Sequence, residues 1–240
     1  AQTASQCFDI SVWQFLMAPI LGAKVVIIKD ESSRDPQALT MSLLHEKVSI
    51  WEPVPIMLSA VTNTIKTSQQ GLPQLRWVLP TGEALNRSVV DRWFALQPHL
   101  QPKTPLMNAY GPAECSDDVA FEPIYETTDQ VLIGSPVANV NLHVVNECLS
   151  LVPIGVVGEL AVSGPMVGRG YLESPELTNS VFKHNPFAKD AEDKRLYLSG
   201  DLVKRLPDGR LKYIIRTDDQ VKIRGFRIEL GEIENALSAH

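Results

Sequence analysis

The chain has 240 residues, of which 44% are hydrophobic and 21% are charged, and its formal net charge at pH 7 is −6. This composition is ordinary for a globular protein, and the acidic balance argues against nucleic acid as a partner. No apolar run approaches the roughly 20 residues that a membrane-spanning helix needs. The three cysteines are few and widely spaced, so we expect reduced cytoplasmic thiols rather than a disulfide framework or a metal set.

Both ends of the sequence indicate a piece of a longer polypeptide. The chain does not begin with Met, it carries no signal peptide, and it stops at His240 inside an expected helix. We therefore expect further residues on either side of it.

The first 110 residues alternate between expected helices and short apolar strands. We expect helices over 11–21, 36–46, 55–66 and 86–96, and strands over 24–29, 48–51, 75–79 and 106–107. Apolar residues lie on most faces of the 11–21 helix, which predicts that it is buried. The alternation predicts an α/β fold in which helices cover a mainly parallel sheet.

After residue 114, short strands follow one another with Gly and Pro between them. They cover 119–125, 140–145, 158–163, 196–198 and 221–224, and Asp208-Gly209 marks a tight turn between two strand segments. This pattern predicts an antiparallel or β-barrel-like region. Residues 229–240 have carboxylates early, as a helix start prefers, so we expect the start of a small α+β subdomain there.

The seven residues 108–114, Asn-Ala-Tyr-Gly-Pro-Ala-Glu, combine an aromatic ring, a turn and a carboxylate. Gly111-Pro112 favours a turn, because Gly permits positive φ and Pro fixes φ near about −65°. Tyr110 could present its ring face to a flat ligand, and Glu114 could reach a metal ion. The alternative is a hairpin with a packed Tyr and a solvated Glu.

Three other segments place polar residues at the ends of expected elements. Asp201 follows a strand and a Gly, where a carboxylate either accepts two hydrogen bonds from a vicinal diol such as ribose or closes its own turn. Thr81-Gly82-Glu83 ends a strand of the parallel half and could line one crevice with 108–110. Asp9 begins a helix, where it either stabilises the helix dipole or receives an ammonium group.

Two further patterns have a structural interpretation as well as a functional one. Gly168-Arg169-Gly170 follows a strand and is favoured as a turn cluster over a direct ligand contact. Residues 220–229 alternate cations with apolar residues. This alternation indicates either an exposed edge strand or a strand that contacts a phosphate or a carrier partner.

Together and in this order, these segments resemble the adenylation domain of nonribosomal peptide synthetases, in the AMP-binding, adenylate-forming superfamily. The resemblance rests on residues 8–11, 108–114, 158–172, 197–201 and 216–234. It implies that ATP, Mg²⁺ and an amino acid form aminoacyl-AMP and pyrophosphate. The acyl group would then pass to a phosphopantetheine thiol on a peptidyl carrier domain, with a condensation domain in the same synthetase. The implied division is a core subdomain at 1–217 and a hinge with the start of a small subdomain at 218–240.

The resemblance also implies a role for each motif residue. Glu114 would help to hold Mg²⁺, Asp201 would bind the ribose hydroxyls, and Arg216 would lie near the ribose and phosphate, so these three are the expected catalytic residues. Asp218 would be the hinge. The expected nucleotide-binding set is Thr81, Gly82, Glu83, Asn108, Ala109, Tyr110, Gly111, Asp201 and Arg216.

By its spacing from the same motifs, the family's substrate pocket falls on Asp9, Ile10, Trp13, Glu52, Leu79, Thr81, Ala109, Asp117 and Asp118. Asp9 would pair with the α-ammonium group of the substrate. Glu52, Asp117 and Asp118 would bring three carboxylates to one pocket, and buried like charges are costly without a counter-ion. The hypothesis is a basic amino acid, with Arg first and then Lys, ornithine or diaminobutyrate. The alternative is a neutral polar or aromatic side chain.

Some residues depart from the family pattern. Ala113 stands where Thr is usual, Ile215 stands where Gly is usual, and Thr81-Gly82-Glu83 replaces a Gly-Gly-Glu-like loop. The family's phosphate loop would precede this chain and its C-terminal Lys would follow it, so we expect the 240 residues alone to be inactive.

Two rival interpretations stay open. One is an acyl-CoA or aryl-acid ligase of the same superfamily, for which Asp9 would have no ammonium partner. The other is a non-catalytic fragment that binds nucleotide or a carrier domain.

Overall fold

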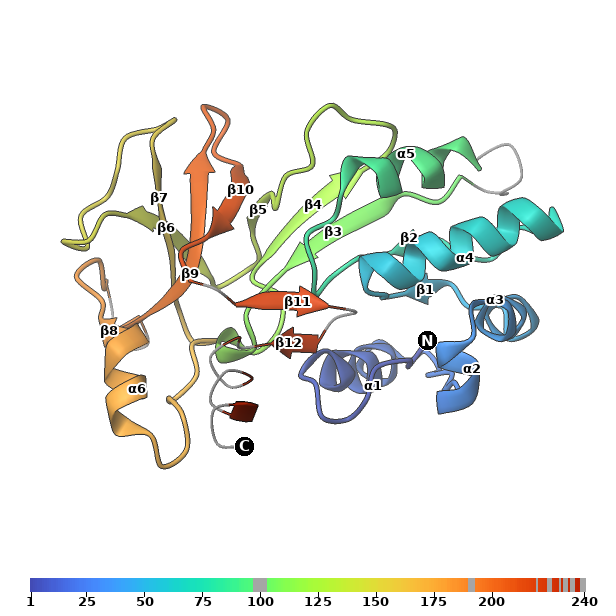
Figure 1. Ribbon diagram of the computed structural model, residues 1–240, viewed down its shortest axis with the longest axis horizontal. Coiled ribbons are helices and arrows are strands. Elements are labelled where there is room, and N and C mark those ends of the chain that lie inside the picture. The colour runs from blue at the N-terminus through green and yellow to red at the C-terminus, as the bar shows by residue number, and fades with distance from the viewer. Residues whose placement is uncertain are drawn as a thin grey trace. The chain divides into compact units, whose positions relative to one another are not determined.

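The computed structural model describes residues 1–96, 103–189, 193–218, 220–223, 226–228, 230, 233, 236 and 237 (Figure 1). The chain divides into two compact units. The first comprises residues 1–109 and 122–131, and the second comprises residues 110–121 and 132–240. The expected boundary between 217 and 218 lies within the second unit and stays a prediction.

The first unit is a parallel sheet with helices. Its helices are α1 (Ile10–Ile20), α2 (Asp30–Arg34), α3 (Pro36–His45), α4 (Pro55–Ser68) and α5 (Arg87–Ala95), and its strands are β1 (Ile50–Trp51), β2 (Trp77–Val78) and β3 (Leu106–Tyr110). Strand β2 pairs in parallel with β1 and with β3. Strand β4 (Ala120–Ile124) follows β3 in the sheet order, and the division between the units passes through both. The expected helix-covered parallel sheet is therefore confirmed.

Local sequence signals account for the start of helices α3 and α4. The carboxylate of Asp35 accepts hydrogen bonds from the backbone N–H of Gln37, at 2.9 Å, and of Ala38, and Pro36 occupies the first turn of α3. Pro55 likewise occupies the first turn of α4, but no side chain caps that helix. The apolar faces of α4 and α5 pack on β2 and β3 in one core, whose most buried members are Trp51, Leu58, Val61, Ile65, Val78, Val90, Trp93 and Leu106.

Two expectations for the first 30 residues are wrong. Helix α1 is not buried, because Val12, Leu16 and Ile20 are all more than half exposed, and its buried residues are Ser11 and Gln14. The polar face turns inward because the Gln14 amide satisfies backbone groups at the chain start. The run 24–29 is not a strand but a single bridge between Gln2 and Ile27. Among the described residues, Gln2 is the only one that forms backbone pairing with this run.

The second unit is mainly antiparallel. It contains β5 (Ser135–Pro136), β6 (Asn141–Val145), β7 (Val157–Ser163), α6 (Pro175–Val181), β8 (Phe182–His184), β9 (Arg195–Arg205), β10 (Leu211–Arg216), β11 (Val221–Ile223) and β12 (Phe226–Ile228). The main sheet has the order β10-β9-β7-β6, and β8 also pairs with β9. The expected antiparallel region is confirmed, and its core includes Leu142, Leu160, Val162, Tyr197, Val203 and Leu211.

Strand β9 is much longer than the expected 196–198. It continues through Ser199-Gly200-Asp201 and ends at the predicted turn, where Gly209 has φ +93° and its N–H donates to Leu206 O at 2.9 Å. The expected helix over 229–240 lies largely outside the described residues, of which Leu230, Ile233, Ala236 and Leu237 are helical. Among the described residues, no helix is both long enough and apolar enough to cross a bilayer.

Candidate functional site

An irregularity in β9 places Asp201 at the centre of a polar cluster. The pairing of β9 with β7 shifts so that Ser199, Gly200 and Asp201 face the single residue Leu160, and the pairing with β10 shifts between Tyr213 and Ile215. Such bulges redirect side chains and are common beside functional sites. Here the Ser199 hydroxyl donates to Leu160 O at 2.7 Å, and the Asp201 N–H donates to Ser199 Oγ at 3.1 Å.

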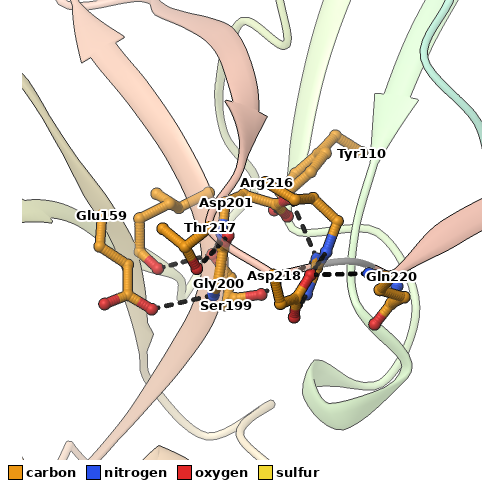
Figure 2. Close-up of polar contacts among 10 residues, drawn as sticks. Tyr110, Glu159, Ser199, Gly200, Asp201, Arg216, Thr217, Asp218 and Gln220 are labelled. Atoms are coloured by element: carbon orange, nitrogen blue, oxygen red, sulfur yellow. Dashed lines mark hydrogen bonds and ion pairs between the residues drawn. The ribbon is translucent and has the colours of Figure 1, made fainter. Parts of the chain in front are cut away.

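Two donors occupy the Asp201 carboxylate (Figure 2). The hydroxyl of Tyr110, from the end of β3, donates to Oδ2. Nη1 of Arg216, from the end of β10, lies 3.0 Å from Oδ1 and also donates to Ser199 O at 3.2 Å. The three side chains thus form one hydrogen-bonded group in the second unit, and both members of the ion pair are largely buried.

The charges of this group follow from burial and pairing. Burial raises the pKa of Asp201, whereas the hydrogen bond from Tyr110 and the positive charge of Arg216 act to lower it. Burial and the adjacent carboxylate raise the pKa of Tyr110, which keeps its proton at neutral pH. Hydrogen bonds to Asp218 raise the pKa of Arg216, so the guanidinium stays charged. The group therefore presents one carboxylate between a neutral and a cationic donor.

Arg216 also holds the segment that follows β10. Its Nε and Nη2 donate to the two carboxylate oxygens of Asp218, each at 2.7 Å, in the bidentate geometry that suits Arg and carboxylate. The Thr217 N–H donates to Gly200 O at 2.8 Å, and the Gly200 N–H donates to Glu159 Oε1 at 2.9 Å. The polar run at 216–218 is therefore fastened to the β9 irregularity (Figure 2).

The segment 111–119 is the connection between the neighbouring strands β3 and β4, so the hairpin considered above is present. A 3-10 turn, η2 (Ala113–Cys115), follows Gly111-Pro112, and the Val119 N–H donates to Tyr110 O at 2.8 Å. Gly111 has no room for a side chain, because a Cβ there would overlap the carbonyl of Asp117. Asp117 itself has φ +84°, a strained value for a non-Gly residue that is often found at functional sites.

Glu114 is not solvated as the hairpin alternative expected. It is half-buried, and its Oε1 accepts a hydrogen bond from the Tyr171 hydroxyl at 2.6 Å. Its backbone oxygen accepts the Gly168 N–H at 2.7 Å. Tyr171 has no role among the residues expected from the sequence. The available signal was its place directly after Gly168-Arg169-Gly170, a pattern that indicates close backbone approach.

The first unit gathers several of the expected residues at one edge of its sheet. The N–H of Leu79 donates to Trp51 O at 2.9 Å, the N–H of Thr81 to Pro53 O at 3.1 Å, and the N–H of Ala109 to Pro80 O at 3.0 Å. Glu52, Thr81 and Ala109 therefore lie at the carboxyl ends of the neighbouring strands β1, β2 and β3. In open α/β sheets this edge is where ligands bind.

A buried carboxylate lies at this edge. Glu52 is 1% exposed, and the Gln14 amide donates to its backbone oxygen at 3.2 Å and to its Oε2 at 3.3 Å. The Gln14 side-chain oxygen accepts the N–H of Thr3 and of Ala4. This network links α1 to the end of β1.

The other expected residues are placed as follows. Asp9 caps α1, and its Oδ1 accepts the Ile10 N–H at 3.0 Å. Ile10, Trp13, Gly82 and Glu83 are half-buried, and Asn108 is buried. In the second unit, Asp118 is 8% exposed and Asp117 is half-buried. Each unit thus carries part of the expected substrate-binding set.

The chain is similar to known peptide synthases along nearly its whole length. It is 37% identical over 235 residues to tyrocidine synthase 3 of Brevibacillus parabrevis, a match of 98% of this chain and 4% of that protein. It is 38% identical to enterobactin synthase component F of Escherichia coli (strain K12), a match of 100% of this chain and 18% of that protein. The chain therefore spans only a small part of these relatives.

Two solved structures have the same fold. The Vibrio cholerae adenylation domain AlmE, in complex with glycyl-adenosine-5′-phosphate, superposes with a TM-score of 0.81 at 29% identity, over 98% of this chain and 43% of that one. A four-domain nonribosomal peptide synthetase bound to AMP and glycine gives 0.78 at 34% identity, over 98% and 17%. The family model of the AMP-binding enzymes matches residues 1–172. Because this match covers most of the 240 residues, the chain belongs to the AMP-binding enzyme family.

Proposed function

We propose that this chain is part of an adenylation domain that activates an amino acid with ATP within a nonribosomal peptide synthetase. The observation that carries the proposal is the Asp201 carboxylate, held between the Tyr110 hydroxyl and the Arg216 guanidinium on the β9 irregularity. The synthases among its relatives, and a structural relative that binds glycyl-adenosine-5′-phosphate, support it.

In this proposal each side chain has a chemical task. A vicinal diol can donate two hydrogen bonds to one carboxylate, so Asp201 receives the ribose hydroxyls. Arg216 is permanently charged and lies beside Asp201, where it neutralises phosphate charge. Tyr110 offers its ring face to adenine. The rest of the adenine-binding set is Thr81, Gly82, Glu83, Asn108, Ala109 and Gly111.

The reaction requires positioning more than covalent catalysis. An oxygen of the amino acid carboxylate forms a bond to the α-phosphorus of ATP, and the bond between that phosphorus and the pyrophosphate oxygen breaks. The residues aligned with the phosphates stabilise the charge that this exchange moves. Glu114 would hold Mg²⁺, since carboxylate oxygens are its preferred protein ligands, and the ion supplies further phosphate neutralisation when bound.

The acyl group then passes to a partner. We propose that a phosphopantetheine thiol on a peptidyl carrier domain forms a thioester with the acyl group, while the bond between the acyl carbon and the phosphate oxygen breaks and AMP leaves. We propose a condensation domain as a further neighbour. Asp218 is proposed as the hinge between the core at 1–217 and the small subdomain at 218–240. The bidentate contact from Arg216 to Asp218 supports a connection between the nucleotide site and this hinge.

For the substrate, we propose a basic amino acid, with Arg first and then Lys, ornithine or diaminobutyrate. Glu52 and Asp118 are both more than nine-tenths buried, and a buried carboxylate is stabilised by a cationic partner. Asp117 is the third expected carboxylate, and Asp9 would receive the α-ammonium group. The remaining pocket positions are Ile10, Trp13, Leu79, Thr81 and Ala109.

The test is amino-acid-dependent exchange of pyrophosphate into ATP by the full-length protein that contains this chain. A panel of amino acids identifies the substrate, and Asp9→Ala should abolish activation of all of them. A preference for Leu or Val would overturn the basic-substrate proposal while keeping the activity. Activation of a fatty or aryl acid without an amino group, unaffected by Asp9→Ala, would instead identify an acyl-CoA or aryl-acid ligase.

A further inference from the structure

Tyr171 makes a contact that the adenylation chemistry above does not use. Its hydroxyl donates to Oε1 of Glu114 at 2.6 Å, although the two residues are 57 positions apart in the sequence. We propose that Tyr171 is a positioning residue that fixes the orientation of the Glu114 carboxylate for Mg²⁺. This inference rests on the magnesium role given to Glu114 in the proposed function.

The loop that carries Tyr171 is attached to the backbone around Glu114. The Gly168 N–H donates to Glu114 O at 2.7 Å, and Ser116 Oγ donates to Met166 O at 3.0 Å. A Cβ on Gly168 would lie 2.8 Å from Glu114 O, so this close approach requires glycine. The Arg195 guanidinium holds the same loop from β9, with Nη1 donating to Gly168 O at 2.8 Å. These contacts fix the backbone of Glu114 independently of its side chain.

The Tyr171 ring is itself held in place. Its backbone N–H donates to Thr178 Oγ1 at 2.9 Å, and that hydroxyl donates to Ser174 O at 2.8 Å. The ring packs edge to face on Phe182, with centroids 5.7 Å apart and an interplanar angle of 73°. Phe182 packs in turn on Tyr197 of the core. Because the backbone of Tyr171 is bonded to Thr178 and its ring packs on Phe182, the Tyr171 hydroxyl is presented at one position.

The hydrogen bond from Tyr171 restricts the orientation of the Glu114 carboxylate. A glutamate carboxylate rotates about a broad terminal torsion, so a donor bound to one oxygen sets where the other oxygen points. With Oε1 accepting from the Tyr171 hydroxyl, the Glu114 carboxylate is held in one orientation. Partners of metal-binding carboxylates commonly contribute about 10-fold or more to metal affinity. Tyr171 should therefore affect the magnesium dependence of nucleotide binding rather than nucleotide binding itself.

The experiment uses Tyr171→Phe in the full-length protein, which removes one hydroxyl and keeps the ring. Binding of a non-hydrolysable ATP analogue is followed by calorimetry at increasing Mg²⁺ concentration. We expect the Mg²⁺ concentration at half-maximal binding to rise about 10-fold, with unchanged binding in the absence of Mg²⁺ and an unchanged melting temperature. Tyr125→Phe is the control, because Tyr125 is an exposed tyrosine of the first unit that packs on Trp77. It should leave the titration unchanged. Gly168→Ala, which crowds the Glu114 carbonyl, should shift the titration in the same direction as Tyr171→Phe.

A double variant separates the possible outcomes. If Tyr171 acts through Glu114, Tyr171→Phe should add nothing in a Glu114→Gln background. A normal magnesium titration for Tyr171→Phe beside an altered one for Glu114→Gln overturns this inference alone, and so does a Tyr171→Phe effect that persists undiminished in the Glu114→Gln background. A normal titration for Glu114→Gln overturns both this inference and the magnesium role of Glu114, while amino-acid-dependent exchange would still support adenylation.

Discussion

Replacing Arg216 by Met should destabilise the second unit, because it leaves a buried carboxylate without its cation. Arg216 and Asp201 pair at 3.0 Å with side chains only 17% and 10% exposed. Removing one partner of a fully buried pair costs about 3–5 kcal/mol, and the partial exposure of this pair reduces the expectation to about 2–3 kcal/mol. Met keeps most of the apolar stem and so retains its packing. For a unit of this size, the loss corresponds to a melting temperature lower by roughly 5–10 °C.

The matched control is Arg210→Met in the same hairpin. Arg210 contacts a carboxylate two residues away, Asp208, at 2.7 Å, as Arg216 contacts Asp218, but both members of the Arg210–Asp208 pair are more than 40% exposed. Exposed ion pairs contribute little, so Arg210→Met should leave the melting temperature unchanged. Thermal unfolding followed by calorimetry measures both variants. Equal effects of the two substitutions would refute the claim that the Asp201 contact, rather than a generic surface charge, stabilises the site.

Two further predictions concern protonation and accessibility. The Tyr110 hydroxyl lowers the pKa of Asp201, so Tyr110→Phe raises it, and Asp201 then takes up its proton at a higher pH during acidification. The ribose hydroxyls need the ionised carboxylate as their acceptor, so the acidic limb of the pH profile of nucleotide binding should move to higher pH. An acidic limb that stays in place or moves to lower pH would contradict this prediction. Cys115 is fully buried, and burial raises the pKa of its thiol, so a thiol reagent should modify the two exposed cysteines quickly and Cys115 only after unfolding. Rapid modification of all three cysteines in the folded protein would show that Cys115 is not buried beside η2 as described.

The sequence was sufficient for the elements whose signals are local. The expected helix start at residue 36 agrees with α3, where Pro36 is the first residue, and Asp208-Gly209 predicted the turn that ends β9. The sequence was not sufficient where contacts with distant residues determine which face of an element is buried. Helix α1 is as apolar as a core helix, yet its polar face turns inward, because Gln14 finds backbone partners at residues 3, 4 and 52. Such long-range polar contacts leave no periodic trace in the sequence.

The candidate site shows the same division. The motif positions of Tyr110, Asp201 and Arg216 were predicted from the family resemblance, and their joint contacts were not. Asp201 and Arg216 are 15 positions apart and are brought together by the β9–β10 hairpin and its shifted register. Tyr171 was missed because a tyrosine after a glycine turn is an ordinary pattern until its hydroxyl is seen to reach Glu114. Pairing across distant segments is what the structure adds.

The central claim is that Asp201 serves nucleotide-dependent activation of an amino acid. The most direct measurement is amino-acid-dependent ATP–pyrophosphate exchange by the full-length protein, compared among the wild type, Asp201→Ala and Asp208→Ala. Asp208 is an exposed carboxylate of the neighbouring turn and serves as the control. We predict exchange for the wild type and Asp208→Ala, and a loss of about 100-fold or more for Asp201→Ala. Exchange with no amino acid at all, or exchange by Asp201→Ala as fast as by Asp208→Ala, would contradict this role of Asp201.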